Sequence, residues 1–264
     1  MSHLSVKRIS AGYGKHNVIE NISFDLDAGT YMGIIGANGS GKTTLLKALC
    51  GILPHEGTCA LEDITLEHLS ARQIAKLVSY IPQRSGISID ISALDVVLMG
   101  FNPRLGLLEH PTKKMKATAI AALEQVGLGG KEGTNYLHLS EGQKQLCILA
   151  RTLVSDSKLL LLDEPESALD FRFRYQMLSL LRSWVALGKR SAIVTLHDPS
   201  LALNFCDKLL LLADEGVLGI LEPKAESLDK IEQMLSMVYG NISLQRCQNR
   251  KGESQIVILR EGEV

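Results

Sequence analysis

The sequence predicts an α/β protein built on a mostly parallel sheet, and three observations support this fold class. After residue 139, helix-length segments alternate with short apolar runs, as happens when helices connect parallel strands. An apolar run at 31–35 leads through a glycine-rich loop into a helical segment at 44–49. Between 85 and 133 the strand signal disappears, which predicts a helical subdomain inserted at 85–135.

Each predicted element has a local signal. Strands are predicted for short apolar or alternating runs bounded by polar residues, at 4–9, 22–26, 31–35, 58–61, 77–81, 158–162, 191–196, 208–213, 242–244 and 255–259. The first two flank an expected turn at 11–14 and form an N-terminal antiparallel region. Helices are predicted where apolar residues recur at helical spacing, at 44–49, 71–76, 92–99, 113–126, 140–154, 172–187 and 232–239. Ser92 and Asp95 have capping-box spacing, and Asp198 followed by Pro199 opens a further helix.

Composition narrows the class of protein. The chain has 264 residues, and its formal charge of −1 gives no electrostatic reason to expect nucleic acid as a partner. Mean hydropathy is +0.11 although no apolar run reaches membrane-spanning length, which predicts a soluble protein with an apolar face for a partner. Five cysteines are scattered without a C-x-x-C pair, and the N-terminus has no signal-peptide pattern. We therefore expect reduced thiols in a cytoplasmic protein, without disulfides or zinc.

The glycine-rich loop is the most specific motif. It matches G-x-x-x-x-G-K-[ST] in full and consists of Gly36, Ala37, Asn38, Gly39, Ser40, Gly41, Lys42 and Thr43. Thr44 follows the motif and continues the helix. Glycines allow successive backbone N–H groups to point at a phosphate, and the helix beginning at Lys42 adds the positive end of its dipole. We expect Lys42 to reach the β- and γ-phosphate oxygens and the Thr43 hydroxyl to bind Mg²⁺. The flanking strand and helix favour nucleotide binding over a glycine-rich surface loop.

A second motif supplies two acids. The apolar run 159–162 ends at Asp163, Glu164 and Pro165. We expect this strand to lie beside the phosphate-loop strand, so that Asp163 contacts Mg²⁺ directly or through water. Glu164 is then placed to polarise the attacking water as a general base. The simpler interpretation is a buried strand that ends in a solvated acidic turn, and the phosphate loop upstream weakens it.

Further motifs make the sequence similar to the ATP-binding-cassette (ABC) family. The segment Ser140, Glu141, Gly142 and Gln143, after Leu139, resembles the family signature Leu-Ser-Gly-Gly-Gln. The other family motifs are matched in order by the adenine-stacking aromatic Tyr13, the Q-loop Gln83, the D-loop Asp170 and the switch histidine His197. The resemblance covers about residues 4–215. It implies a P-loop NTPase of the ABC cassette type, a single domain over 1–264. Residues 215–264, which follow the resemblance, are expected to extend the core, with a small dimer contact as the alternative.

The resemblance also implies roles for these residues. Lys42, Glu164, His197 and Gln83 would form the catalytic set, with Gln83 on Mg²⁺ or water and His197 on the γ-phosphate and Glu164. The implied cofactors are ATP and Mg²⁺. The signature serine and its helix N-terminus form a second anion site, which in the family faces the nucleotide of a second cassette. We therefore expect a dimer, most simply a homodimer, that closes on ATP and opens after hydrolysis.

Two residues depart from the family pattern near the signature. Glu141 replaces the usual glycine, and Leu146 stands where many relatives have arginine. A carboxylate near a γ-phosphate is repulsive, so Glu141 either points to solvent or slows hydrolysis. We expect it to point to solvent, because Ser140, Gly142 and Gln143 remain.

One cassette without a membrane span implies the separate ATP-hydrolysing subunit of a multi-chain transporter, peripheral on the inner face of the cell membrane. The stretches 92–106 and 121–128 are similar to importers of iron–siderophore, haem, cobalamin and molybdate-type oxyanions, with Phe101 in place of an arginine. Transmembrane permease subunits are expected on the block 85–133, where Phe101 and Leu105 are either contacts or core, and a substrate-binding protein would act indirectly. A soluble ABC ATPase without a permease and a weakly hydrolytic ATP-gated binding module remain as alternatives.

Overall fold

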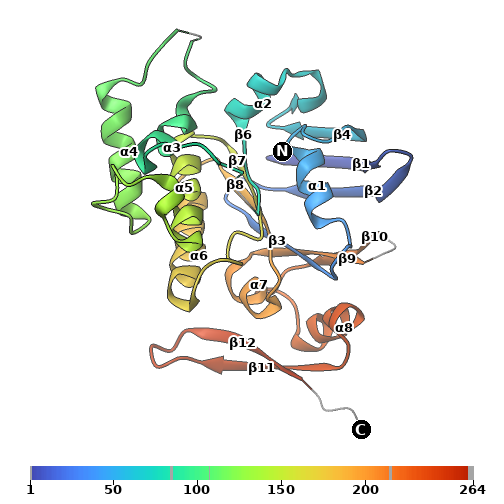
Figure 1. Cartoon of the computed structure of the whole chain (residues 1–264). Coiled ribbons are helices and arrows are strands. Elements are labelled where there is room, and N and C mark those ends of the chain that lie inside the picture. The colour runs from blue at the N-terminus through green and yellow to red at the C-terminus, as the bar shows by residue number, and fades with distance from the viewer. Residues whose placement is uncertain (1, 84–85, 107, 214–215, 261–264) are drawn as a thin grey trace.

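The centre of the molecule is a sheet with the strand order β10-β9-β3-β8-β7-β6, seen in a computed structural model that describes residues 2–83, 86–106, 108–213 and 216–260 (Figure 1). The strands are β3 (Tyr31–Gly36), β6 (Val78–Ile81), β7 (Leu159–Asp163), β8 (Ser191–Thr195), β9 (Lys208–Ala213) and β10 (Gly216–Leu221). Neighbouring strands from β6 to β9 are parallel, and β10 is antiparallel to β9. The mostly parallel sheet predicted from the sequence is therefore confirmed, although β10 itself is not predicted.

The strand order contradicts one expectation about the site. From the sequence we expect β7, which ends at Asp163, to lie directly beside the phosphate-loop strand β3. This is wrong, because β8 lies between them and pairs with both. β7 and β8 follow one another in the chain through helix α6 (Phe171–Ala186), and a crossover of this kind commonly places the second strand next to the first.

A second, antiparallel sheet has the order β2-β1-β4-β5. Its strands are β1 (Leu4–Tyr13), β2 (His16–Leu26), β4 (His55–Leu61) and β5 (Ile64–Thr65). The expected turn at 11–14 is wrong in position, because β1 continues to Tyr13, which pairs with His16. Gly12 lies within β1, and only glycine fits there because a Cβ would lie 1.9 Å from the main-chain oxygen of His16. The turn occurs at Gly14, where φ is 65°.

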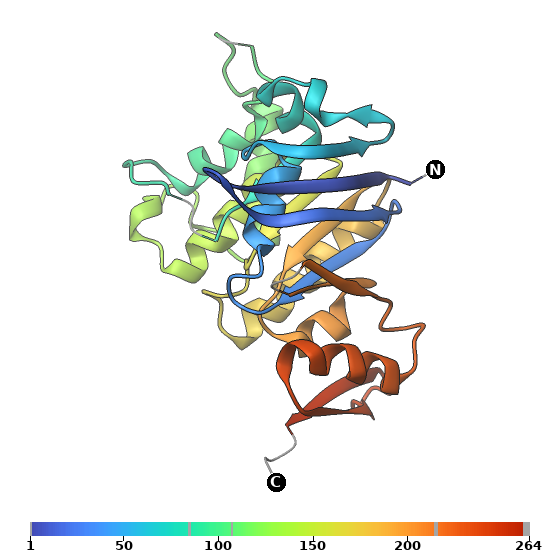
Figure 2. The same ribbon diagram turned by 90° about the vertical axis from the view of Figure 1, so that its right-hand side faces the viewer.

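Helices cover both faces of the parallel sheet (Figures 1 and 2). The helices besides α6 are α1 (Lys42–Leu49), α2 (Ala71–Leu77), α3 (Ala93–Leu98), α4 (Lys113–Gln125), α5 (Glu141–Val154), α7 (Pro199–Phe205) and α8 (Leu228–Tyr239), with 3-10 turns at Leu66–His68, Met99–Phe101 and Tyr136–His138. α3, α4 and α5 pack on one another, and α4 projects from the upper left of Figure 1. The capping box expected at α3 forms only in part. The Ser92 hydroxyl accepts the Asp95 N–H, as in a capping box, but the Asp95 carboxylate accepts the Ser92 hydroxyl where a complete box would have it accept the Ser92 main-chain N–H.

The packing places α1 between the two sheets. Consecutive leucines of β7 are fully buried and alternate between two apolar cores. Leu159 and Leu161 face the core shared with α1 and the antiparallel sheet, whereas Leu160 and Leu162 face the core shared with α5 and α6. Alternation of this kind follows from the two-residue period of a strand covered on both faces. It leaves Asp163, the last residue of β7, at the end of the sheet where α1 begins.

The C-terminal segment adds α8 and the hairpin β11 (Ile242–Gln248) and β12 (Ser254–Arg260), which lie together at the bottom of Figures 1 and 2. The helix predicted at 232–239 begins earlier, because Ser227 caps it by accepting the Lys230 N–H. Asn204 of α7 exchanges two hydrogen bonds with the backbone of Ile256, which attaches the hairpin to the core. The predicted segment boundaries at 85 and 215 lie outside the described residues.

Candidate active site

The phosphate loop joins β3 to α1 through positions that require glycine. Gly39 and Gly41 have φ of 88° and 90°, and a Cβ on Gly36 would lie 2.3 Å from the main-chain oxygen of Leu212. Gly41 precedes α1 without a side-chain cap, so the first N–H groups of the helix remain available to an anion. A hollow of about 260 Å³ at this loop is lined by Val18, Asn38, Gly39, Gly41, Lys42, Thr43, Thr44 and Glu164.

Lys42 lies folded over the loop. Its ammonium donates to the main-chain oxygens of Gly36 and Ala37, each at 2.9 Å, and the residue is 6% exposed. Burial lowers the pKa of Lys42, while the carboxylates of Glu164 and Asp163 act in the opposite direction. The cation is therefore held where a β- or γ-phosphate would bind the loop.

Asp163 accepts three hydroxyl groups. Thr43 Oγ1 and Thr195 Oγ1 each donate to its Oδ1 at 3.0 Å, and Tyr80 Oη donates to its Oδ2 at 3.3 Å. Burial, followed by the charge of Asp163, raises the pKa of Tyr80, which keeps that hydroxyl a donor. Hydroxyl and carboxylate oxygens are ligands that Mg²⁺ prefers, usually with phosphate oxygens and water completing the shell. The Thr43–Asp163 pair therefore fits this ion.

Glu164 connects the remaining catalytic candidates. Its Oε1 lies 2.7 Å from His197 Nε2, and its Oε2 accepts a 2.6 Å hydrogen bond from Gln83 Nε2. Its main-chain N–H donates to Thr195 Oγ1 at 2.8 Å, and its φ of 47° is unusual for a residue other than glycine. Strain of this kind persists where surrounding contacts enforce it, and here they aim the carboxylate between Gln83 and His197.

A family model described as ABC transporter matches residues 19–167. The chain belongs to the ABC transporter family. Members are ATP-hydrolysing cassettes, and the match includes the phosphate loop and the two acids of β7.

Relatives and solved structures agree with this membership. A Helicobacter pylori protein named as an iron chelatin transport ATP-binding protein is 36% identical over 216 residues, covering 80% of this chain and 84% of that protein. The hemin import ATP-binding protein HmuV of Bordetella bronchiseptica is 35% identical over 246 residues, covering 90% and 92%. A structure described as an inward-facing metal-chelate type ABC transporter has a TM-score of 0.82 and 28% identity, covering 99% of both chains.

The ABC signature lies at the start of α5. Ser140 caps this helix by accepting the Gln143 N–H at 3.3 Å, and the Gln143 side chain accepts the Ser140 N–H at 3.2 Å. The Glu141 side chain is 78% exposed and pairs with Lys144 at 2.7 Å. The expected solvent orientation of Glu141 is therefore observed. Gly142 is tightly placed, since a Cβ would lie 3.2 Å from the main-chain oxygen of Ala168.

The fold brings some predicted residues of the cassette together and leaves others apart. One cluster forms at the ends of β3, β6, β7 and β8 and contains Lys42, Thr43, Asp163, Glu164 and the two side chains bonded to Glu164. Outside the phosphate loop, six predicted residues neither belong to this cluster nor line the hollow at the loop: Tyr13, Ser140, Glu141, Gly142, Gln143 and Asp170. Tyr13 is 52% exposed and lines a separate hollow of about 470 Å³ at the end of β1. Asp170 caps α6 by accepting the Phe173 N–H at 3.0 Å.

Three residues near the site are not predicted from the sequence. Thr195 bonds to both acids of β7, and Tyr80 donates to Asp163. Gln145 of α5 donates to the main-chain oxygen of Gln83 at 2.6 Å, which ties the Q-loop to the signature helix. Thr195 stands at the end of its strand, like Asp163, and this position is the one signal that points to it.

The remaining candidates divide between core and surface. Phe101 is 9% exposed and packs in the core of the α3–α5 bundle, so its core interpretation holds. Leu146 is also buried in that core. Leu105 is half-buried and lines a shallow groove with Arg72, Ala75, Met99, Asn102, Pro103, Gly106 and Glu109. Within the ranges that the structure describes, no helix combines the length and apolar character needed to cross a membrane.

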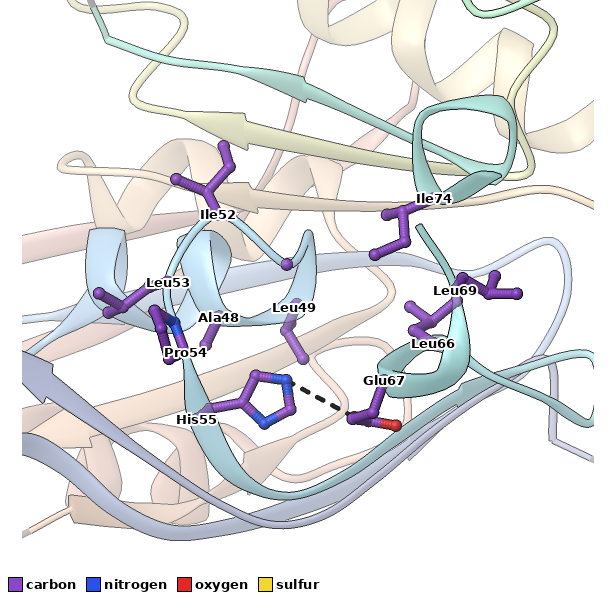
Figure 3. Close-up of a pocket in the computed structure, with 11 residues that line it drawn as sticks. Ala48, Leu49, Ile52, Leu53, Pro54, His55, Leu66, Glu67, Leu69 and Ile74 are labelled. Atoms are coloured by element: carbon purple, nitrogen blue, oxygen red, sulfur yellow. Dashed lines mark ion pairs between the residues drawn. The ribbon is translucent and has the colours of Figure 1, made fainter. Parts of the chain in front are cut away.

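Another hollow lies at the opposite end of α1 from the phosphate loop (Figure 3). It measures about 320 Å³, and its walls include the buried side chains of Leu49, Leu66 and Ile74. His55 Nε2 and Glu67 Oε1 approach to 3.5 Å at one side of it. None of the predicted site residues lines this hollow, so it stands apart from the candidate active site.

Proposed function

We propose that this cassette hydrolyses ATP to power a multi-chain importer of a metal chelate, such as an iron chelate or haem. The main support for ATP hydrolysis is the position of Glu164 between His197 and Gln83, beside the Thr43–Asp163 pair. The chelate class is supported by the names of the Helicobacter and Bordetella relatives and by the metal-chelate type structure.

The chain's own residues suggest how hydrolysis proceeds. Lys42 and the N–H groups at the start of α1 bind the β- and γ-phosphates, and Tyr13 stacks on adenine. Thr43, Asp163 and the amide oxygen of Gln83 would hold Mg²⁺, which neutralises phosphate charge when bound. Glu164 orients the water for in-line attack and accepts its proton. His197 holds the Glu164 carboxylate and contacts the γ-phosphate.

Members of the family act as dimers with transmembrane permeases, and for this chain we propose a homodimer. The capped N-terminus of α5 would bind the γ-phosphate held by the other copy, with Ser140, Gly142 and Gln143 facing it. Asp170, in the turn against which Gly142 packs, would line the same interface. The exposed Glu141 supports a hydrolytic cassette over a weakly hydrolytic binding module, because its charge is paired with Lys144.

For the permease we propose docking on the inserted segment 85–135, with the complex peripheral on the inner face of the cell membrane. The groove that contains Leu105 and Pro103 lies between α2 and the end of α3 and offers apolar side chains beside Arg72 and Glu109. A substrate-binding protein would act through the permease and not touch the cassette. Residues 215–264 serve in this proposal as an extension of the core.

ATP turnover by wild type and Glu164→Gln, each assembled with the neighbouring permease in lipid, tests the proposal. We expect turnover in wild type and its loss in Glu164→Gln, while ATP binding and ATP-dependent dimerisation persist. Wild type that binds ATP without turnover in the complex would contradict hydrolysis. Turnover that is unaffected by the permease, and a failure of the two to copurify, would instead favour an ABC ATPase without a permease.

A further inference from the structure

Glu166 is a buried acid that the proposed mechanism does not use. It lies two residues after Glu164, in the turn that leads to Asp170, and is 3% exposed. Its Oε1 accepts the main-chain N–H of His197 at 3.3 Å. An acidic side chain is seldom buried without a specific partner, so the contact with His197 indicates the role of Glu166.

The contact completes a two-point attachment of His197. Glu164 holds the imidazole through Nε2 at 2.7 Å, and Glu166 holds the backbone of the same residue. Both carboxyl groups come from one short turn. Two main-chain hydrogen bonds close this turn, from the Ser167 N–H to the Glu164 carbonyl oxygen and from the Leu169 N–H to the Glu166 carbonyl oxygen. A shift of this turn therefore moves the ring contact and the backbone contact together.

The surroundings of Glu166 favour the neutral acid. Burial raises its pKa, and the nearby Glu164 carboxylate acts in the same direction, although N–H groups of Glu166 itself and of His197 oppose them. Its Oε2 is buried and has no hydrogen-bond partner within the described ranges, which is costly for an ionised carboxylate. A glutamine side chain has nearly the same shape and keeps a carbonyl acceptor, so it should replace the neutral acid well.

We propose that Glu166 is a positioning residue that holds the His197 backbone so that the imidazole stays on Glu164. The inference rests on the proposed ATPase function, because it assigns Glu166 a part in that same site. In this proposal Glu166 acts through the His197 backbone and not by contacting nucleotide or water. Loss of its acceptor leaves the His197 N–H unpaired and frees the loop after β8, and small misplacements of catalytic groups lower rates by about tenfold to a hundredfold.

The test compares Glu166→Gln with Glu166→Leu in the cassette–permease complex. Leucine fills similar space but accepts no hydrogen bond. We expect Glu166→Leu to lower kcat by at least about tenfold with the KM for ATP changed less than about twofold, and Glu166→Gln to keep at least about a third of wild-type kcat. Met177→Ala changes a buried residue of α6 that takes no part in these hydrogen bonds, so it controls for loss of stability and should keep kcat within about twofold.

A second readout follows His197 itself. In the full-length chain labelled with ¹⁵N-histidine, the His197 ring signals are assigned with His197→Gln. We expect Glu166→Leu to shift them and Glu166→Gln and Met177→Ala to leave them in place. Normal kcat in Glu166→Leu, equal losses in both Glu166 variants, or unshifted His197 signals in Glu166→Leu would overturn the inference. Absence of turnover in wild type would overturn the proposed function instead, and the histidine signals would still decide the role of Glu166.

Discussion

Replacing Thr195 by valine tests how the ends of β7 and β8 hold the catalytic acids. Thr195 is fully buried at the end of β8, and its hydroxyl has two partners. It accepts the Glu164 N–H at 2.8 Å and donates to Asp163 Oδ1 at 3.0 Å. Valine keeps the branched shape of threonine and removes both hydrogen bonds, so the change isolates the hydroxyl.

The expected cost follows from these two bonds. Asp163 keeps the Thr43 and Tyr80 hydroxyl groups as donors, so losing its bond to Thr195 costs about 1 kcal/mol. The Glu164 N–H loses its acceptor in a part-buried position, which costs about 1–3 kcal/mol. We therefore expect Thr195→Val to lower the free energy of unfolding by about 2–4 kcal/mol. Because the same bond orients Glu164, kcat should fall as well.

Urea denaturation of the nucleotide-free chain, followed by far-UV circular dichroism, measures this loss. Thr195→Ser is the matched control, because it keeps the hydroxyl and should stay within about 1 kcal/mol of wild type. A loss below about 0.5 kcal/mol in Thr195→Val, or an equal loss in both variants, would refute the reasoning from the two hydrogen bonds.

Three further changes address the signature, the phosphate loop and acid stability. Glu141→Gly should alter ATP turnover less than about threefold, because the replaced side chain is 78% exposed, and a tenfold gain in a turnover assay would contradict its solvent orientation. Gly36→Ala should lower the thermal midpoint and abolish binding of a fluorescent ATP analogue, since its Cβ would lie 2.3 Å from the Leu212 oxygen, and an unchanged midpoint would disprove the clash. Glu62→Gln should be less stable than wild type at neutral pH. Mainly through a hydrogen bond from Lys158, the pKa of Glu62 is held below its ordinary value of 4.5, so this stabilisation is lost as pH falls through the lowered pKa. Urea denaturation across pH should show the two proteins converging in acid, and a constant difference would count against the pairing.

The antiparallel sheet shows where local sequence signals mislead. The glycines at 12 and 14 both suggest a turn, yet only Gly14 belongs to it. Gly12 is needed because the neighbouring strand passes within 1.9 Å of where its Cβ would be. A glycine required by a neighbouring strand looks the same in the sequence as one required by a positive φ.

Local chemistry determined most of the candidate site. The phosphate loop, the acids after β7 and the caps of α5 and α7 depend on residues a few positions apart, so the sequence alone predicts them. The tertiary structure decided which strands are neighbours and hence what surrounds those acids. Thr43 and Asp163 meet across 120 residues and Thr195 and Asp163 across 32, because crossover helices bring the ends of β3, β8 and β7 to one edge of the sheet. No local pattern encodes that strand order, since it is the joint burial of both sheet faces that selects it.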